Sequence, residues 1–360
     1  MSLPLLVFTQ GDPAGIGPEV VVRALLGRGA AAPDFLPLVI AEAAALDALR
    51  PSLPELPWDR LEVFPAPPAA ERIAEAVAAG RLPVLDPVGE RRTVALGTSG
   101  PADAAGALAA LDAGRDLVAS GAADALVTAP LAKESIARQV RPGFVGHTEY
   151  LAAAAGLERY GRDYLMAFLA PDLQVALLST HLPLRAALDA VSAEAIGEAL
   201  DRLAASAGGR IAVAGFNPHA GEGGLLGSED AALVAPAVAA ARGRGLDVHG
   251  PESPDSVFAR ARRGEVDWVL ALYHDQGLIA VKTAAFGTAT NWTLGLPYLR
   301  TSVDHGTAFA LAGRAAADAG PLSAVIAATL DLLAGRLPRR RSGRSAATTP
   351  RGRSTPPGSS

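Results

Sequence analysis

The sequence predicts a two-domain α/β protein with α/β/α layering and mainly parallel sheets. Short apolar runs alternate along the chain with Ala- and Leu-rich helical segments, which is the pattern of repeated βα units. A polar or glycine-rich loop follows each of the clearest apolar runs. With 360 residues, half of them hydrophobic, the chain is long enough to bury two cores of ordinary size.

Five apolar runs are predicted to be strands, at residues 3–8, 124–129, 174–180, 210–216 and 266–273. Helices are expected at residues 18–28, 102–120, 183–206 and 229–243. Pro18 suits the first turn of the first helix, and Ser228 is placed to cap the last one.

The loops after these strands carry most of the polar motifs. In chain order they read TQGDPAGIGPE, PLAKES, HLP, NPHAGEGG and HDQG. In open α/β sheets, ligands bind beyond the carboxyl ends of parallel strands. We therefore expect the five loops to line one crevice, with the active site between the domains.

Composition excludes several classes of protein. The chain has no cysteine, so any metal must be held by nitrogen and oxygen ligands, and we expect a cytoplasmic protein. No apolar stretch suits a membrane span, and the first ten residues lack the features of a signal peptide. The net charge is −5, but residues 336–360 carry seven arginines and no acid, which leaves −12 on residues 1–335. We expect a body that binds no nucleic acid and a disordered basic tail over 336–360.

Residue types that are rare in this chain gather in or beside the loops. The only lysines are Lys133 and Lys282, and the only asparagines are Asn217 and Asn291. Arginine readily replaces a surface lysine, but it does not replace a compact ammonium that must contact one atom or move a proton. The pattern indicates chemistry at these loops.

Three of the six histidines follow predicted strands. His181, His219 and His274 lie 38 and 55 residues apart, too far for a local zinc motif. Each alone is explained by an ordinary hydrogen-bonding role, but three at one edge of a sheet suit Zn²⁺, Mn²⁺, Co²⁺ or Ni²⁺. Asp275, beside His274, is placed to orient a ligand.

The glycine-rich segments fit no standard nucleotide motif. GDPAGIGPE at residues 11–19 lacks the third glycine of a dinucleotide fingerprint and the GK[ST] of a Walker loop. In GEGGLLGSE, at residues 221–229, the backbone of Gly223 and Gly224 could hold an anion at a helix N-terminus, although a plain turn explains it nearly as well.

Three polar residues recur at intervals of nine: Lys282, Asn291 and Arg300. An ammonium, an amide and a guanidinium on one segment offer a phosphate or carboxylate several charge-assisted hydrogen bonds. The alternative is three surface residues on a strand–turn–strand segment.

Several long motifs then occur together and in order from about residue 5 to residue 335. GDPAGIGPE, TAPLAKES, GHTEYLA, LSTHLPL, GFNPHAGEGGLLGSE, GPESPDS, YHDQGLIAVK and TLGLPYLRTSVDHGTAFALAG resemble the 4-hydroxythreonine-4-phosphate dehydrogenase family of pyridoxal phosphate biosynthesis. The resemblance implies a fold like that of isocitrate and isopropylmalate dehydrogenases. It also implies an oxidative decarboxylase that uses NAD or NADP and one divalent metal ion (Zn, Mg, Mn or Co). The implied enzyme is a homodimer whose active site is shared between subunits, with no membrane partner.

The resemblance also implies roles for individual residues. The metal ligands would be His181, His219 and His274, one of them from the other subunit. The phosphorylated substrate would be bound by His147, Thr148, Lys282, Asn291 and Arg300. The cofactor would lie near Asp304, His305 and Gly306, with Gly223 and Gly224 as further candidates, and protons would be relayed by Lys282, Asp255 and Asp275.

We predict a discontinuous first domain of residues 1–130 plus 283–335 and a dimerising second domain of residues 131–282. The implied reaction converts 4-phosphooxy-L-threonine to 3-amino-2-oxopropyl phosphate. A paralogue acting on phospho-threonate or phospho-erythronate remains an alternative, because the motifs contact groups common to all these compounds. A three-histidine metallohydrolase and a metal-stabilised binding protein without catalysis are alternatives from other classes.

Overall fold

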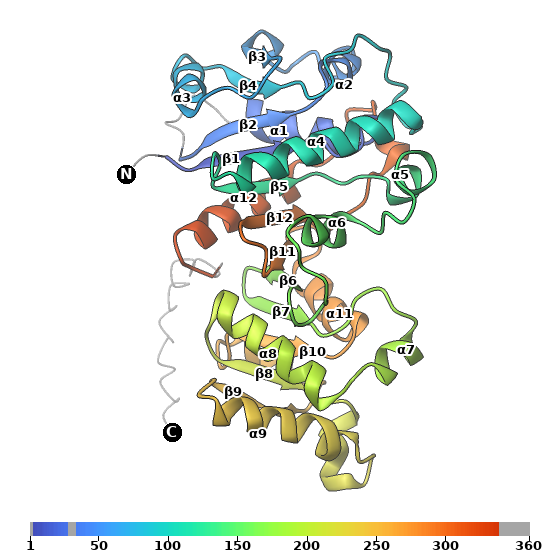
Figure 1. The fold of residues 1–360 in the computed structure, drawn as a ribbon, viewed down its shortest axis with the longest axis vertical. Helices are drawn as coiled ribbons and strands as arrows, with labels where there is room; N and C mark the ends of the chain where they lie inside the picture. Colours follow the sequence, from blue (N-terminus) through green and yellow to red (C-terminus); the bar gives the residue numbers. More distant parts are fainter. Residues whose placement is uncertain (1–2, 28–33, 338–360) are drawn as a thin grey trace, which may run out of the picture.

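The computed structural model describes residues 3–27 and 34–337, which form an elongated molecule built on one twelve-stranded sheet (Figure 1). From residue 338 onward, the predicted basic tail lies outside the described residues. The strand order is β3-β4-β2-β1-β5-β12-β11-β6-β7-β10-β8-β9. The strands are β1 (Leu5–Thr9), β2 (Leu36–Ile40), β3 (Leu61–Phe64), β4 (Leu82–Leu85), β5 (Ala125–Thr128), β6 (Leu165–Ala170), β7 (Leu173–Leu177), β8 (Ile211–Ala214), β9 (Val248–Glu252), β10 (Trp268–Ala271), β11 (Thr290–Leu294) and β12 (Leu299–Val303).

The sheet consists of two parallel blocks joined by antiparallel strands. Strands β3, β4, β2, β1, β5 and β12 pair in parallel, and so do β7, β10, β8 and β9. Between the blocks, β12, β11, β6 and β7 pair antiparallel. The predicted α/β fold with mainly parallel pairing is confirmed.

The helices lie on both faces of the sheet. They are α1 (Gly17–Leu26), α2 (Ala43–Leu49), α3 (Ala70–Ala78), α4 (Pro101–Ala119), α5 (Lys133–Gln139), α6 (His147–Ala154), α7 (Leu184–Asp189), α8 (Ala193–Ala207), α9 (Ala235–Gly243), α10 (Val257–Arg262), α11 (His274–Ala285) and α12 (Gly320–Leu333). Short 3₁₀ or π segments are η1 (Trp58–Arg60), η2 (Pro218–Gly224), η3 (Asp230–Val234) and η4 (Phe309–Leu311).

In the first parallel block, alternate residues of each strand enter opposite cores. Leu6 and Phe8 of β1 pack in the core that includes α1 and α12, whereas Leu5 and Val7 pack in the core that includes α4. This period of two is the geometry of a strand covered on both faces.

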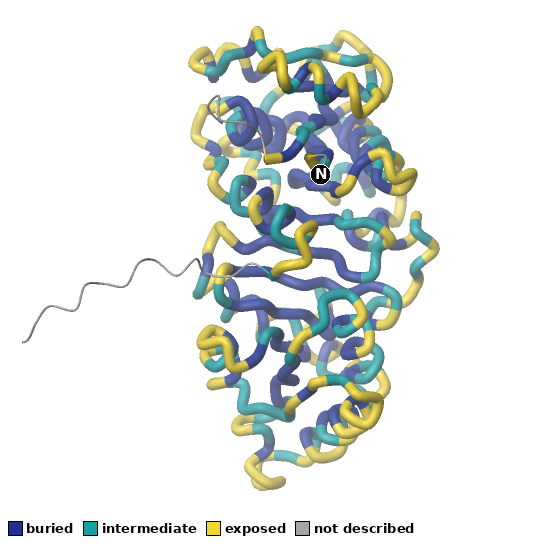
Figure 2. Tube along the Cα trace, turned by 90° about the vertical axis from the view of Figure 1, so that its left-hand side faces the viewer, coloured by how far each residue is buried: buried dark blue, intermediate teal, exposed yellow. Residues whose placement is uncertain are grey.

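The second block is layered in the same way. Ala176 of β7 packs with residues of α8 and α9, and Val175 and Leu177 pack with residues of α10 and α11. The strands are buried along the middle of the molecule (Figure 2). Each block therefore has its own pair of cores, and the antiparallel strands lie where the two sets meet.

The structure corrects several expected boundaries. The five predicted strands are present but shorter, and the structure adds β2, β3, β4, β6, β9, β11 and β12. The predicted helix 183–206 is two helices, because the chain breaks at residues 190–192 and Ser192 caps α8 by accepting from the Ala195 N–H at 3.1 Å. Ser228 does not cap the segment after it: that segment begins as a π turn at Asp230, with Glu229 at the N-cap and no side-chain cap bond.

The expectation of five loops around one crevice is wrong. The two parallel blocks run in opposite directions, because three antiparallel pairings separate β12 from β7. Of the five predicted loops, those after β5, β7 and β10 line the main cavity described below, and those after β1 and β8 do not. Pro18 does lie in the first turn of α1, as predicted.

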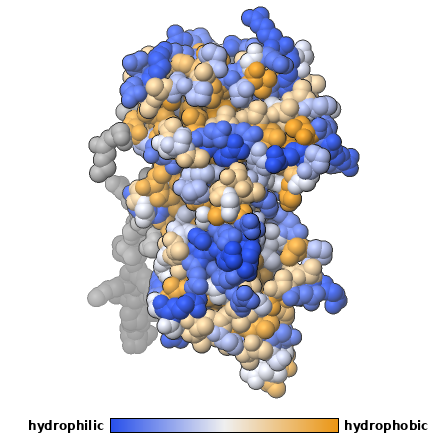
Figure 3. Space-filling model, in the orientation of Figure 1, coloured by the Kyte–Doolittle hydropathy of each residue, from blue (hydrophilic) through white to orange (hydrophobic). Residues whose placement is uncertain are grey.

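The proposed division into domains 1–130 plus 283–335 and 131–282 stays a prediction. The chain passes from α6 to β6 through residues 155–164, where Arg162 pairs with Asp163. Hydrophilic and hydrophobic areas alternate over the face seen in Figure 3, with a hydrophilic patch in its lower half. Within the described residues, no helix is long and apolar enough to cross a membrane.

Candidate active site

A cavity of about 200 Å³ opens where the two blocks of the sheet meet. Both blocks and the antiparallel strands between them contribute to its lining. The lining residues are Thr128–Leu131, Lys133, His147–Glu149, Met166, Phe168, His181, His274, Asn291, Arg300 and Ser302–Gly306. The cavity thus brings together most of the residues that sequence motifs predicted for substrate, metal and cofactor binding.

Arg300, on β12, is the most deeply buried charge of the cavity, with 2% of its surface exposed. Its Nη1 donates to Thr293 Oγ1 at 3.1 Å and its Nη2 donates to Thr128 Oγ1 at 2.7 Å. Burial lowers the pKa of Arg300 to about 10, which still leaves the guanidinium protonated at neutral pH. In the described part of the chain its hydrogen-bond partners are neutral hydroxyls, so an anion is the complement it lacks.

Three buried polar atoms at the Arg300 end of the cavity have no hydrogen-bond partner among the described residues. They are Arg300 Nε, His147 Nε2 and Asn291 Oδ1. Nearly all buried polar atoms in proteins are hydrogen-bonded, so unsatisfied ones that line a cavity indicate a ligand. Because a flip exchanges the two ends of an amide, Asn291 can offer either its oxygen or its NH₂ group.

His147 and Thr148 reach the same end from the first turn of α6. Thr148 is buried, and Gly146 precedes the helix with an extended backbone. Desolvation lowers the pKa of His147 well below its usual value, and the positive charges of Arg300 and Lys133 lower it further. The imidazole is therefore neutral at physiological pH and offers one N–H donor and one acceptor.

Two of the predicted metal ligands face each other across the cavity. The ring centroids of His181 and His274 are 5.2 Å apart. His274 Nδ1 lies 2.7 Å from Asp275 Oδ1, a contact that orients the ring as predicted. Desolvation, then the charge of Lys133, lowers the pKa of His181 and favours the neutral form that binds metal ions.

The third predicted ligand, His219, lies elsewhere. It lines a separate cavity with Asp255, and its Nδ1 is 3.8 Å from Asp255 Oδ2. Its loop, η2, is strained, since His219, Ala220 and Glu222 have φ values of 52°, 53° and 45°. Among residues 3–27 and 34–337, no three histidine or carboxylate side chains are placed to hold one metal ion. A single chain therefore brings two of the three imidazoles together.

The other predicted residues are divided between the cavity and its surroundings. Asp304, His305 and Gly306 line the cavity, whereas Lys282 lies just outside it, with its Nζ 3.4 Å from Asp304 Oδ2. Burial raises the pKa of Asp304, and Lys282 opposes that rise. Gly223 and Gly224 are on the exposed loop of His219 and do not line the main cavity.

Motif reasoning assigned no role to Lys133 and Glu149, which line the cavity. A Cβ atom on Gly146 would be 3.0 Å from Lys133 Cε and 3.2 Å from Glu149 Oε2, so both side chains pack over the bare backbone there. The rarity of lysine was the available signal for Lys133. Met166 and Phe168 belong to β6, a strand that was not predicted.

Comparisons with known proteins agree with this geometry. Residues 36–329 match the family described as "Pyridoxal phosphate biosynthetic protein PdxA". A 4-hydroxythreonine-4-phosphate dehydrogenase from Aromatoleum aromaticum is 40% identical over 335 residues, covering 90% of this chain and 95% of that protein. A D-threonate 4-phosphate dehydrogenase from Salmonella typhimurium is 37% identical, covering 92% and 100%.

Solved structures give the same result. The crystal structure of 4-hydroxythreonine-4-phosphate dehydrogenase from Klebsiella pneumoniae superimposes with a TM-score of 0.77 at 34% identity, covering 92% of this chain and 99% of that one. A putative 4-hydroxythreonine-4-phosphate dehydrogenase from Salmonella typhimurium gives a TM-score of 0.76 at 36% identity, covering 91% and 99%.

Proposed function

This chain belongs to the PdxA family of pyridoxal phosphate biosynthetic proteins, and we propose that it oxidises and decarboxylates 4-phosphooxy-L-threonine to 3-amino-2-oxopropyl phosphate. The predicted family and dehydrogenase class are confirmed by relatives that match nearly the whole chain. The observation that carries the assignment of a phosphorylated substrate is the buried guanidinium of Arg300, whose hydrogen-bond partners among the described residues are neutral hydroxyls, in a cavity that also holds two imidazoles.

The phosphate of the substrate would bind at the Arg300 end. Arg300 Nε, His147 and Asn291 have free hydrogen-bonding capacity there, and the Thr148 hydroxyl is close by. A dianionic phosphate would compensate the buried guanidinium and accept from several of these donors at once. The geometry of that end requires no other chain.

A divalent metal ion would be held at the other end. The facing imidazoles of His181 and His274 fit two positions of its coordination shell, and the neutral state of His181 suits a ligand. We propose that the third imidazole is His219 of the partner subunit, because His219 is exposed on a strained loop outside its own chain's cavity. The ion would supply positive charge beside the reacting hydroxyl and carbonyl oxygens.

A homodimer is supported by apolar side chains that surround this end. Leu182 and Leu184 follow His181, Ile279 lies on α11 beyond His274, and Phe286 follows the end of that helix; between 49% and 84% of each residue is exposed. A second copy would bury them and complete the donor set. We expect a dimer whose dissociation removes metal binding, measurable by light scattering with added Co²⁺.

A nicotinamide cofactor, NAD or NADP, would accept the hydride from the carbon that bears the hydroxyl. Asp304, His305 and Gly306 are the residues we propose beside it, and a role for Gly223 and Gly224 stays a prediction. Lys282 and Asp304, paired at 3.4 Å, can take the hydroxyl proton and pass it towards solvent. Asp275 holds His274, and Asp255 would accompany His219 into the shared site.

Decarboxylation leaves an electron pair on the substrate carbon between the carbonyl and the departing carboxylate. We assign the proton that this carbon needs to the Lys133 ammonium, which lines the same cavity as Arg300 and the imidazoles and whose charge lowers the pKa of both His181 and His147. The two-electron oxidation is balanced by the cofactor, and the lysine regains its proton from solvent.

The test is formation of reduced cofactor, followed by absorbance, with 4-phosphooxy-L-threonine and with phosphorylated threonate as alternative substrates. The proposal expects a higher kcat/KM with the amino acid. The relative named D-threonate 4-phosphate dehydrogenase makes threonate 4-phosphate the second candidate. Cleavage of a phosphate or ester bond without reduced cofactor would instead indicate the metallohydrolase.

A further inference from the structure

The backbone pairing between β10 and β8 stops at Leu270 and Val213, and a side chain continues the hydrogen bonds beyond that point. The two strands pair in parallel from Trp268 opposite Ile211 to Leu270 opposite Val213. Beyond that point Gln276, in the first turn of α11, takes over: its Oε1 accepts from the Leu272 N–H at 2.7 Å and its Nε2 donates to the Gly215 carbonyl at 2.9 Å. A primary amide carries the donor and the acceptor of a peptide unit, so it can replace one in a ladder.

The two backbone groups that Gln276 joins belong to segments that carry histidines. Leu272 is two residues before His274, and Gly215 is four residues before His219. A third segment joins at the same point, because Ser179 Oγ, two residues before His181, donates to the Leu272 carbonyl at 3.1 Å. The connections to all three predicted metal ligands therefore meet at Leu272 and Gln276.

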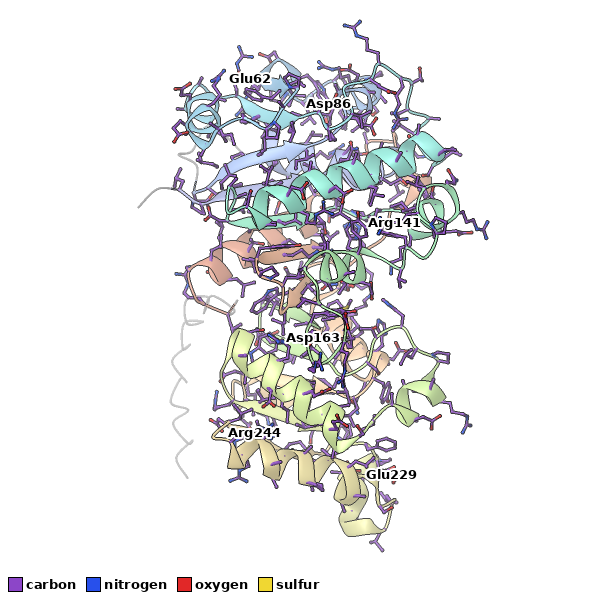
Figure 4. The ribbon with its side chains drawn as sticks, in the orientation of Figure 1. Glu62, Asp86, Arg141, Asp163, Glu229 and Arg244 are labelled. Atoms are coloured by element: carbon purple, nitrogen blue, oxygen red, sulfur yellow. The ribbon has the colours of Figure 1, made fainter. Side chains whose placement is uncertain are left out.

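The loop that carries His219 has a strained backbone, so neighbouring groups must hold it in place. Non-glycine residues at positive φ are strained, and they persist only where the surroundings hold them. The buried carboxylate of Asp230 supplies part of this support, accepting from the Phe216 N–H at 2.6 Å and the Asn217 N–H at 2.9 Å. Glu229, labelled near the lower end of the molecule in Figure 4, accepts from Asn217 Nδ2 at 2.8 Å.

Gln276 differs from these acids in what it connects. Asp230 and Glu229 hold the loop to the segment that follows it, whereas Gln276 holds the start of the loop to the corner between β10 and α11. Gln276 therefore links the segment that carries His219 directly to the segment that carries His274.

We propose that Gln276 is a positioning residue of the metal site, which fixes the loop of His219 relative to His274. The inference rests on the proposed function, since it requires these histidines to bind a metal ion. In the proposed dimer His274 serves the site of its own chain and His219 is presented to the other subunit. One amide would then set ligand positions in both sites of the dimer.

The full-length protein can test this with Gln276→Met, which keeps the length of the side chain and removes both amide contacts. The matched control is Gln174→Met, because Gln174 is a buried amide on β7 whose Nε2 donates to the Ala170 carbonyl at 3.1 Å, away from the histidine loops. Cobalt(II) binding, followed by visible absorption, is expected to weaken about 10- to 100-fold in Gln276→Met. Cobalt(II) binding in Gln174→Met is expected to match the wild type, whatever the change in Tm.

Hydrogen exchange of the metal-free protein gives a readout that requires no metal. Residues 216–224 are expected to exchange faster in Gln276→Met than in the wild type or in Gln174→Met. Gln276→Glu keeps an acceptor for the Leu272 N–H but loses the donor to Gly215, so it should loosen the His219 loop and leave the start of α11 protected.

Unchanged cobalt affinity and unchanged exchange in Gln276→Met would overturn the inference and leave the proposed function standing. A wild-type protein that binds no cobalt would instead contradict the proposed metal site. In that case the exchange of residues 216–224 alone decides whether Gln276 holds the loop.

Discussion

The two ends of the main cavity are built in opposite ways. The anion end is assembled from strands and a helix start, with Arg300 buried between Thr128 and Thr293. The histidine end is assembled from segments that follow strands, where His181 is exposed and His219 lies outside the cavity. In our proposal, one chain therefore supplies all the groups that bind the phosphate, whereas the metal ion takes one ligand from a second chain.

The difference has a physical basis. A buried guanidinium must be desolvated and held by surrounding structure, so the sheet is the suitable place for it. A site that closes between two subunits must present its groups outward, and such groups are carried by loops. Changes at the anion end should therefore affect affinity without affecting assembly, and changes at the histidine end should depend on both chains.

The largest expected effect at the anion end is that of Arg300→Met. Loss of several charge-assisted contacts to phosphate should lower kcat/KM about 1,000-fold, mainly through KM. Tm should change little, because a buried charge without a carboxylate partner is replaced by an apolar side chain of similar size. Differential scanning fluorimetry with inorganic phosphate checks the assignment: phosphate should raise the Tm of the wild type only. A large drop in Tm without loss of phosphate binding would contradict it.

Replacement of Lys133 tests the residue that lies between the two ends. Lys133→Met should lower kcat about 100-fold, the usual size of a general acid–base contribution, and Lys133→Arg should not restore it. Arg138→Met, on the exposed face of the same helix, is the control and should retain activity. Product formed in D₂O gives a second measurement: stereospecific labelling of the new C–H bond in the wild type should become random in Lys133→Met. Stereospecific labelling in that variant would rule the role out.

A smaller effect is expected in the pH dependence of stability. The folded-state pKa of His147 lies below its unfolded value, so below about pH 6.5 the unfolded chain takes up a proton that the folded chain resists. The contribution of the neutral His147 to the free energy of unfolding is therefore fully present above that pH and is lost as the pH falls. His147→Asn should flatten the fall in Tm between about pH 6.5 and 5, measured by calorimetry, whereas His249→Asn at the exposed His249–Asp247 pair should not. Parallel curves for wild type and His147→Asn would contradict the assignment.

Sequence reasoning succeeded where residue type alone carries information. Alternating apolar runs and helical segments gave the α/β class, and rarity pointed to Lys133, Lys282, Asn217 and Asn291 before any geometry was known. The strands β11 and β12 were missed because their polar residues, such as Asn291 and Arg300, face a cavity and interrupt the apolar pattern. Strand β6, LMAFLA, is apolar throughout, so its sequence did carry the signal of a buried strand. The helix break before Ser192 was missed because alanine and leucine continue on both sides of it.

The reversal of direction between the two blocks could not be read from the sequence. It depends on the antiparallel pairing of β11 with β6, whose paired residues are 121 or more positions apart in the sequence, as in Leu169 opposite Thr290. The reversal does not affect the three histidines relative to one another, because β7, β10 and β8 are parallel neighbours and His181, His274 and His219 follow their carboxyl ends. His219 nevertheless lies on a loop that lines a separate cavity. The local motif was informative about residue type, whereas the cavity that a residue lines depends on the course of its loop.

The central claim is that His181 and His274 of one chain share a metal ion with His219 of the other. Co-expression of differently tagged His181→Ala and His219→Ala chains tests it directly, since each variant alone should be inactive. Random pairing makes half of the dimers mixed, and each mixed dimer has one intact site, so about one quarter of wild-type activity should return. Purified mixed dimers should bind one cobalt ion instead of two. Absence of activity in those mixed dimers, or full activity in either variant alone, would contradict the shared site.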